Sequence, residues 1–158
     1  VSPKIKIIED AAHACGTEIK KEKIGSHGQF VCFSFHPVKN LAMPSGGLIA
    51  INDKKHSELE NALKSKRWCG ITNRKDTDYD VKEIGWNYYM NEFSAAIGLV
   101  QLKKIQKMNE QRKKIAKIYE NEIDLEEKIK FSRSCSYHLY WIRVKNRNEF
   151  RKKLEGLL

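Results

Sequence analysis

One stretch decides the fold of this chain: Phe33-Ser34-Phe35-His36-Pro37-Val38-Lys39-Asn40. Its first residues alternate in the manner of a strand, and a loop that contains proline and one lysine follows. Upstream, the run Ile5 to Ile8 predicts a second, buried strand that leads into Glu9-Asp10-Ala11-Ala12-His13. Open α/β sheets bind ligands beyond the carboxyl ends of their strands. Lys39 and Asp10 are therefore candidates for a common site.

A lysine and an aspartate in separate strand-end loops are the pair that a pyridoxal-phosphate enzyme needs. The amine holds the cofactor aldehyde as a Schiff base, and the carboxylate keeps the pyridine nitrogen protonated, so that the ring withdraws electrons. Taken alone, each residue has a plainer interpretation, because most lysines after a strand are solvated and Asp10 can cap a helix. The lysine loop closes at Gly46-Gly47, where the lack of Cβ permits a sharp turn or a close approach to a ligand.

These segments, in this order, resemble the DegT/DnrJ/EryC1/StrS family of sugar aminotransferases. The similarity continues through the turn Gly25 to Gly28, the segment Gly85-Trp86-Asn87-Tyr88 and the run from Glu92 to Leu102. It implies an α/β fold, namely the fold-type I large domain of pyridoxal-phosphate-dependent transferases, with a mixed, mostly parallel sheet flanked by helices. We accordingly assign residues 1–105 to part of this cofactor-binding domain. Residues 106–158 are assigned to a long linking helix and the start of a smaller C-terminal α/β domain.

The resemblance also implies roles for five residues of this chain. Lys39 would form the Schiff base and then shuttle protons, while Asp10 would pair with the pyridinium nitrogen. His13 stands where the family has Gln or His near the ring oxygen of the cofactor, and Ser34 matches a serine that bonds its phosphate. Asn87 matches an asparagine that reaches the phosphate of the neighbouring subunit's cofactor. The expected assembly is thus a homodimer with shared active sites.

The chain departs from the family pattern in places. Many members have Asn-Tyr-Arg where this chain has Asn87-Tyr88-Tyr89, so the role of that arginine is not transferred. Met43-Pro44-Ser45 fills a position where many members have a glycine followed by an acidic residue. The family's amino-terminal part and the end of its carboxy-terminal domain have no counterpart. We interpret the chain as an internal fragment that is inactive by itself.

Composition and charge favour a globular domain over a membrane-spanning or nucleic-acid-binding protein. With 158 residues, 41% of them hydrophobic, the chain is long enough for one core, and it has no apolar run of membrane-spanning length. Much of the net charge of +10 falls in a predicted helix from residue 91 or 92 to about Glu120. An apolar stripe, Ile105, Met108, Ile115 and Tyr119, is expected to face a partner element while the lysines face solvent. A nucleic-acid-binding domain is the less favoured alternative, because no zinc finger, RNP-type run or basic zipper accompanies the charge.

The four cysteines and the remaining histidines carry no recognisable chemistry. Cys15, Cys32, Cys69 and Cys135 form no CxxC pair, so we predict no metal site and a reducing, cytoplasmic location. His36, His56 and His138 have no partners in the sequence pattern and are interpreted as structural.

Periodicity predicts the remaining elements. The expected strands are Phe30 to Phe35, Leu48 to Asn52 and Tyr140 to Val144, and the expected helices run from residue 52 or 53 to about Lys66 and from Asn148 to Leu154. In the first of these helices, Leu59, Ala62 and Leu63 are expected on the buried side. The polar stretch Gly70 to Lys82 predicts a long loop.

Together these observations predict an aminotransferase that moves an amino group from an amino acid, glutamate by resemblance, onto a nucleotide-linked keto-sugar, in the synthesis of amino sugars or cell-surface polysaccharide. A sugar dehydratase of the same family is the nearest enzymatic alternative, but those members carry histidine in place of Lys39. The alternative from a different class is a non-catalytic homologue that keeps the fold without turnover. Expected partners are the nucleotide sugar, the amino acid and a second copy of the chain, with no nucleic acid and no membrane.

Overall fold

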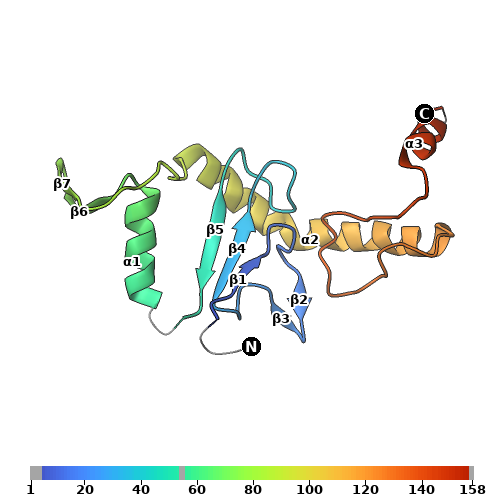
Figure 1. The fold of residues 1–158 in the computed structure, drawn as a ribbon, viewed down its shortest axis with the longest axis horizontal. Coiled ribbons are helices and arrows are strands. Elements are labelled where there is room, and N and C mark those ends of the chain that lie inside the picture. Colours follow the sequence, from blue (N-terminus) through green and yellow to red (C-terminus); the bar gives the residue numbers. More distant parts are fainter. Residues whose placement is uncertain (1–4, 54–55, 157–158) are drawn as a thin grey trace.

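The centre of the computed structural model, which describes residues 5–53 and 56–156, is a three-stranded sheet. Its strands are β1 (Ile8–Asp10), β4 (Phe30–Ser34) and β5 (Gly47–Ile51), in the order β1-β4-β5. β1 is parallel to β4, and β5 is antiparallel to β4. The described part of the sheet therefore contains both parallel and antiparallel pairs. Figure 1 shows α1 beside β5 and the long α2 running across the sheet.

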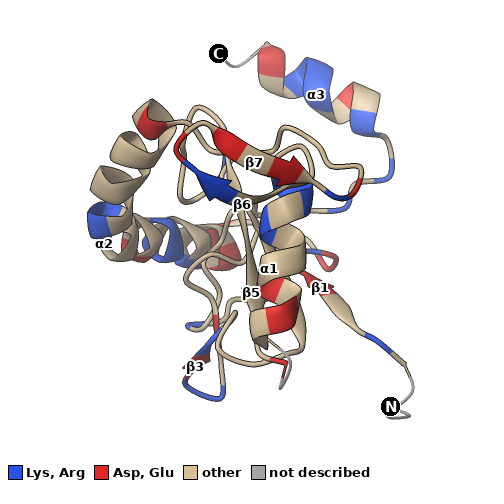
Figure 2. Cartoon of the chain, turned by 90° about the vertical axis from the view of Figure 1, so that its left-hand side faces the viewer, with Lys and Arg blue, Asp and Glu red and all other residues tan. Residues whose placement is uncertain are grey.

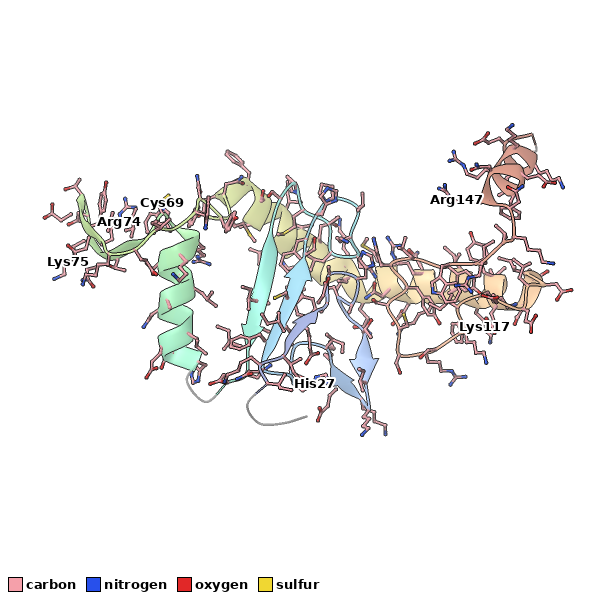
Figure 3. All side chains as sticks on the ribbon, viewed as in Figure 1. His27, Cys69, Arg74, Lys75, Lys117 and Arg147 are labelled. Carbon is pink, nitrogen blue, oxygen red and sulfur yellow. The ribbon has the colours of Figure 1, made fainter. Side chains whose placement is uncertain are left out.

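The other elements extend the molecule on both sides of this sheet. The helices are α1 (His56–Arg67), α2 (Glu92–Glu122) and α3 (Arg147–Glu155), and two small hairpins pair β2 (Glu18–Ile19) with β3 (Glu22–Lys23) and β6 (Ile71–Lys75) with β7 (Asp78–Val81). Figure 3 shows the β6–β7 hairpin, marked by Arg74 and Lys75, at one end of the molecule and α3, marked by Arg147, near the other. The sheet lies between these two ends.

Two strands and three helices were predictable within a few residues. β4 ends one residue before the predicted Phe35, and β5 is shifted by one residue toward the amino terminus. α3 exceeds its predicted range by one residue at each end. α1 ends at Arg67, one residue beyond the predicted Lys66; the predicted caps Asn52 and Asp53 lie before its first described residue, His56, and residues 54–55 between them lie outside the described residues. In α1 the expected buried face is only partly correct, since Leu59 and Leu63 are half-buried, Ala62 is exposed and Ser65 is buried.

Three predicted elements are wrong. The strand expected at Ile5 to Ile8 starts only at Ile8, where pairing with β4 begins, and Ile5 is 61% exposed. The loop expected at Gly70 to Lys82 contains the β6–β7 hairpin, whose turn places Asp76 in the left-handed region that Asp tolerates. Tyr140 to Val144 forms no strand, because a single bridge from Ile142 to Lys128 is its only β-pairing among the described residues.

α2 begins where its capping residue dictates. The side chain of Asn91 accepts a hydrogen bond from the backbone nitrogen of Ser94 at 2.8 Å, which satisfies a free amide of the first turn. The buried line of the helix runs through Ser94, Gly98, Asn109 and Ala116. Of the predicted stripe, Ile105 and Met108 are half-buried, whereas Ile115 and Tyr119 are exposed, although the Tyr119 ring packs edge-on against Tyr140. Figure 2, in which Lys and Arg are blue, shows basic positions along the visible part of this helix.

A glycine lets α2 pack against the lysine loop. A Cβ at Gly98 would lie 2.1 Å from the sulfur of the buried Met43. We therefore expect Gly98→Ala to lower the free energy of unfolding by about 1–3 kcal/mol through overpacking. Urea unfolding checks the prediction, and the double variant Gly98→Ala/Met43→Ala should be less destabilised than the sum of the single variants. Strict additivity would contradict the contact.

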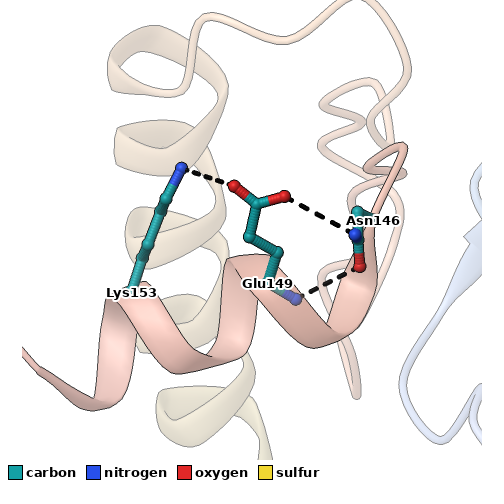
Figure 4. Close-up of polar contacts among 3 residues, drawn as sticks. All are labelled: Asn146, Glu149 and Lys153. Carbon is teal, nitrogen blue, oxygen red and sulfur yellow. Dashed lines mark hydrogen bonds and ion pairs between the residues drawn. The ribbon is translucent and has the colours of Figure 1, made fainter.

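The start of α3 is held by a cap that Figure 4 draws. Asn146 Oδ1 accepts from the backbone nitrogen of Glu149 at 3.2 Å, and the Glu149 carboxylate pairs with Lys153 at 2.8 Å. We expect Asn146→Ala to destabilise α3 by about 0.5–2 kcal/mol, because it removes the cap acceptor. Asn146→Asp keeps that acceptor and serves as the control. Hydrogen exchange of residues 147–152 measures the effect, and equal exchange in the two variants would contradict it.

The described residues form a small core and leave much apolar surface. Six apolar residues are buried: Ala11, Val31, Leu41, Met43, Ala116 and Tyr137. Large side chains such as Ile84, Phe93 and Leu99 are 85%, 84% and 65% exposed. Exposed apolar side chains mark an interaction site where they form a contiguous patch. No helix in the described ranges is both long and apolar enough to cross a bilayer.

Candidate active site

The sheet brings the two candidate loops to one edge. In the parallel pair, Asp10 of β1 lies opposite Cys32 of β4, and β4 ends at Ser34, shortly beyond. The loops after Asp10 and Ser34 therefore leave the same edge of the sheet, as the carboxyl ends of parallel strands do. Figure 3 shows His27 at the opposite end of the strands. The topology thus gathers Asp10, His13, Ser34 and Lys39 on one side of the fold.

The lysine loop is closed by backbone hydrogen bonds. Phe35 donates to the carbonyl of Gly46 at 2.9 Å, and Met43 donates to the carbonyl of Phe35 at 2.9 Å. Inside the loop, the backbone nitrogen of Lys39 donates to the carbonyl of His36 at 2.8 Å. The Lys39 residue is half-buried and forms no ion pair within residues 5–53 and 56–156. The backbone that carries the Lys39 side chain is therefore held in a hydrogen-bonded turn that follows β4.

Ser34 and His36 order the beginning of this loop. The Ser34 hydroxyl accepts from the backbone nitrogen of His36 at 3.4 Å, and the His36 ring accepts from the backbone nitrogen of Val38 at 3.3 Å. Side chains alternate along a strand, so Ser34 and Phe33 point to opposite faces. His36, which was interpreted as structural and without a partner, thus has a partner, because its ring stabilises the turn next to Lys39.

The loop after β1 is anchored on β4. Ala11 donates to the carbonyl of Cys32 at 2.8 Å, and an Asp10 carboxylate oxygen accepts from the backbone nitrogen of Ala12 at 3.0 Å. Asp10 is exposed, whereas Ala11 is buried at 4% exposure. The backbone that carries the aspartate is therefore fixed at the end of β1, and its carboxylate caps the first turn of the following loop.

His13 meets a histidine that sequence reasoning left as structural. The rings of His13 and His138 lie 4.3 Å apart between centroids and are tilted by 50°. Burial lowers the pKa of His138, and the positive charges of His13, Lys39 and Arg112 lower it further. This places Lys39 in the electrostatic environment of the histidine pair. The local sequence around His138 did not predict this contact, because its partner His13 lies far away in the chain.

Asn87 lies in another part of the fold. It forms an isolated bridge with Trp68, and the next residue, Tyr88, donates to the carbonyl of Arg67 at 2.8 Å. Within the described ranges, no hydrogen bond joins Asn87 to the lysine loop. One chain therefore groups four of the five predicted residues and holds the fifth beside the end of α1.

The side chains at this edge suit pyridoxal phosphate. A half-buried amine, a carboxylate, a hydroxyl and two imidazoles are the groups that an aldehyde, a ring nitrogen and a phosphate require. Among the residues that the structure describes, the buried Nδ1 atom of His138 has no hydrogen-bond partner, which leaves this atom able to bond a polar group of a ligand. No cluster of three metal-ligating side chains occurs among the residues described. The residues present fit the organic cofactor.

A small pocket next to this edge is a separate feature. It has a volume of about 140 Å³ and is lined by residues that include Arg112, Tyr137, His138 and Tyr140. Neither Lys39 nor Asp10 lines it. His138 is therefore shared between the pocket and the histidine pair.

Known proteins place the chain in a family. The sequence profile of the DegT/DnrJ/EryC1/StrS aminotransferase family matches residues 2–158. The UDP-4-amino-4,6-dideoxy-N-acetyl-beta-L-altrosamine transaminase of Campylobacter jejuni subsp. jejuni serotype O:23/36 (strain 81-176) is 38% identical over 141 residues. That alignment covers 86% of this chain and 37% of the relative, so the chain spans well under half of the relative's length.

Solved structures agree with this sequence relationship. Helicobacter pylori PseC, an aminotransferase involved in the biosynthesis of pseudoaminic acid, has a TM-score of 0.80 at 31% identity, covering 97% of this chain and 42% of its own. The PLP form of the putative sugar aminotransferase Spr1654 from Streptococcus pneumoniae has a TM-score of 0.87 at 27% identity, with the same coverage. The predicted α/β fold of the fold-type I transferases is confirmed. The chain belongs to the DegT/DnrJ/EryC1/StrS aminotransferase family.

Proposed function

We propose that the full-length protein is a pyridoxal-phosphate-dependent aminotransferase that acts on a nucleotide-linked keto-sugar. The observation that carries this proposal is the position of Lys39 in a fixed loop, at the same sheet edge as the loop of Asp10 and His13, in a chain of this family. Lys39 also argues against the dehydratase alternative, whose members carry histidine at this position.

Each residue of the site would then have a defined task. When bound, pyridoxal phosphate supplies an aldehyde and an electron-withdrawing ring. Lys39 Nζ would hold the cofactor covalently and, once displaced by the incoming amine, would move a proton at the substrate carbon. The carboxylate of Asp10 would keep a proton on the ring nitrogen, because an opposite charge favours the protonated form. Ser34 would donate its hydroxyl hydrogen to the phosphate, and His13 would lie near the ring oxygen.

The substrate class follows from relatives. Campylobacter and Helicobacter relatives are named as transaminases of a UDP-linked amino-dideoxy sugar, and PseC acts in pseudoaminic acid biosynthesis. By this relationship the acceptor is a nucleotide-linked keto-sugar, and the pathway makes amino sugars or cell-surface polysaccharide. Glutamate is the proposed donor. The proposed location is the cytoplasm, where nucleotide sugars are available.

A second copy of the chain is the proposed partner. The first half of α2 exposes Phe93, Leu99 and Leu102, and the segment before it exposes Trp86 and Tyr88. This apolar surface is continuous in sequence with Asn87, the residue that in the family reaches the neighbouring subunit's cofactor. Burying it between two copies would remove it from water at a gain of about 25 cal/mol per Å². A homodimer would therefore complete both sites.

The domain division at residue 105 is likewise a proposal. Gly98 packs against the lysine loop, which supports assigning the first part of α2 to the cofactor domain. Beyond residue 105, however, Asn109 donates to the carbonyl of Cys15 at 3.0 Å. The two parts therefore share contacts at the site.

An amino-transfer assay tests the proposal. The purified full-length protein, supplied with pyridoxal phosphate, is incubated with glutamate and a panel of nucleotide keto-sugars, and products are identified by mass spectrometry. We expect an amino sugar with one keto-sugar and matching release of 2-oxoglutarate. A protein that binds the cofactor yet transfers to none would restrict the proposal to another acceptor class. Failure to bind the cofactor at all would favour the non-catalytic homologue.

A further inference from the structure

A cluster of buried polar residues begins at Asn40, the residue that follows Lys39. Asn40, Asn109 and Ser136 are only 3%, 5% and 0% exposed, although each carries a polar side chain. They come from the lysine loop, from α2 and from the segment after α2. Burying polar groups is unfavourable unless they are hydrogen-bonded, so their bonds decide how these segments are joined.

Asn40 joins the lysine loop to two other segments. Its Nδ2 atom donates to Asn109 Oδ1 at 2.8 Å and to the backbone carbonyl of Ser136 at 2.8 Å. Asn109 in turn donates from Nδ2 to the backbone carbonyl of Cys15 at 3.0 Å. The residue next to Lys39 is therefore linked through one amide to the loop that carries Asp10 and His13.

A second set of bonds connects the same segments. The backbone nitrogen of Ser136 donates to Thr17 Oγ1 at 3.1 Å, and Thr17 Oγ1 donates to Ser136 Oγ at 2.9 Å. Ser136 Oγ then donates to the backbone carbonyl of His13 at 3.3 Å. The backbone of Glu18 also donates to the carbonyl of Ser134 at 3.0 Å. The segment at residues 134–136 thus holds the His13 loop from the other side.

A glycine next to the cluster leaves room for the Asn109 side chain. Gly16 has a φ of +84°, and a Cβ there would lie 2.4 Å from Asn109 Nδ2. An ordinary side chain at this position would displace the amide from the Cys15 carbonyl. Beyond Ser136, the chain continues to His138, which packs on His13.

We propose that the Asn40–Asn109 amide pair is a positioning device: it sets the Lys39 loop against the Asp10–His13 loop and couples both to residues 134–138. The proposal rests on the proposed function, in which the amine of Lys39 must be held at a fixed distance from groups on the neighbouring loop. Alignment of a reacting group makes a large contribution to rate, and small displacements are costly. Asn40 and Asn109 act through Lys39 and need not touch substrate.

Hydrogen exchange followed by mass spectrometry tests the coupling in the full-length protein without cofactor. The variants are Asn40→Ala, Asn109→Ala and the milder Thr17→Val, with Asn121→Ala as control, because Asn121 is an exposed asparagine of the same helix. We expect exchange in the Asn40 and Asn109 variants to rise at least about fivefold in residues 36–43, 11–18 and 134–138 together, because each variant loses two hydrogen bonds and the loss of one accounts for about fivefold. Thr17→Val should raise it in residues 11–18 and 134–138.

A spectroscopic readout separates positioning from simple stability. In the protein loaded with cofactor, the absorbance of the lysine-bound cofactor is titrated with pH. We expect the midpoint to shift in Asn40→Ala and Asn109→Ala, to shift no further in the double variant, and to stay unchanged in Asn121→Ala. A uniform rise of exchange over all segments with an unchanged midpoint would overturn the proposal. If the unmutated protein bound no cofactor at Lys39, the proposed function would fail, while the exchange pattern would still decide whether the pair couples the three segments.

Discussion

Replacing Lys39 with arginine is expected to lower kcat for amino transfer by about 10³-fold or more. The guanidinium group keeps the positive charge but remains protonated, so it neither forms the covalent link nor accepts a proton from the substrate. General acid–base catalysis alone contributes roughly 10²–10⁴-fold, and the loss of covalent binding adds to this. Steady-state assays at saturating cofactor measure the change.

The matched control for this substitution is Lys117→Arg. Lys117 is an exposed residue of α2, labelled in Figure 3 on the part of the helix that extends away from the sheet. We expect its substitution to leave kcat within about twofold of the unmutated protein, as for surface changes away from a site. An active Lys39→Arg enzyme would mean that another group performs the proton transfer.

Gly70→Ala is expected to lower the free energy of unfolding by about 2–5 kcal/mol, summing the penalty for a left-handed residue and that for overpacking. Gly70 has a φ of +75°, and a Cβ there would lie 1.8 Å from the carbonyl oxygen of Glu83. That oxygen belongs to the backbone and has little room to move. Chemical denaturation measures the loss.

Gly156→Ala is the control for the glycine substitution. Gly156 ends α3 with a φ of −78°, and its nearest neighbours would be 3.6 Å from an added Cβ. We expect Gly156→Ala to change the free energy of unfolding by no more than about 0.5 kcal/mol. Because the Gly70 region also holds the backbone around Asn87, Gly70→Ala should weaken any dimer as well. A stable Gly70→Ala protein would show that the chain between α1 and α2 takes another path.

Local sequence patterns correctly predicted the strands and helices that find a pairing or packing partner in the folded chain. The alternating segment of β4 and the apolar run of β5 do pair, and Asn91 caps α2 where the sequence indicated. The alternation of Tyr140 to Val144 was equally clear, but within the described residues the segment pairs only with residues 127–129, through one bridge and two backbone hydrogen bonds. The β6–β7 hairpin was missed for the opposite reason, since polar residues dominate strands that are almost fully exposed. Pairing partners, which a local pattern does not specify, decided these cases.

The same distinction applies to the site. Lys39, Asp10, His13 and Ser34 were found from motifs whose residues lie close together in sequence, and their roles stay predictions. Asn109 and His138 were missed, because each meets its partners from far along the chain. One signal was available for Asn109: it lies one helical turn after Ile105 and next to Met108, beside the apolar stripe expected to be buried, and a polar residue on a buried helix face needs a hydrogen-bonding partner.

Reduction of the holoenzyme with borohydride, followed by peptide mapping, tests the central claim most directly. The account predicts that the full-length protein, loaded with pyridoxal phosphate, loses its visible absorbance on reduction and that the peptide containing Lys39 gains the mass of the reduced cofactor. A cofactor mass on another lysine, or a protein that takes up no cofactor, would contradict it.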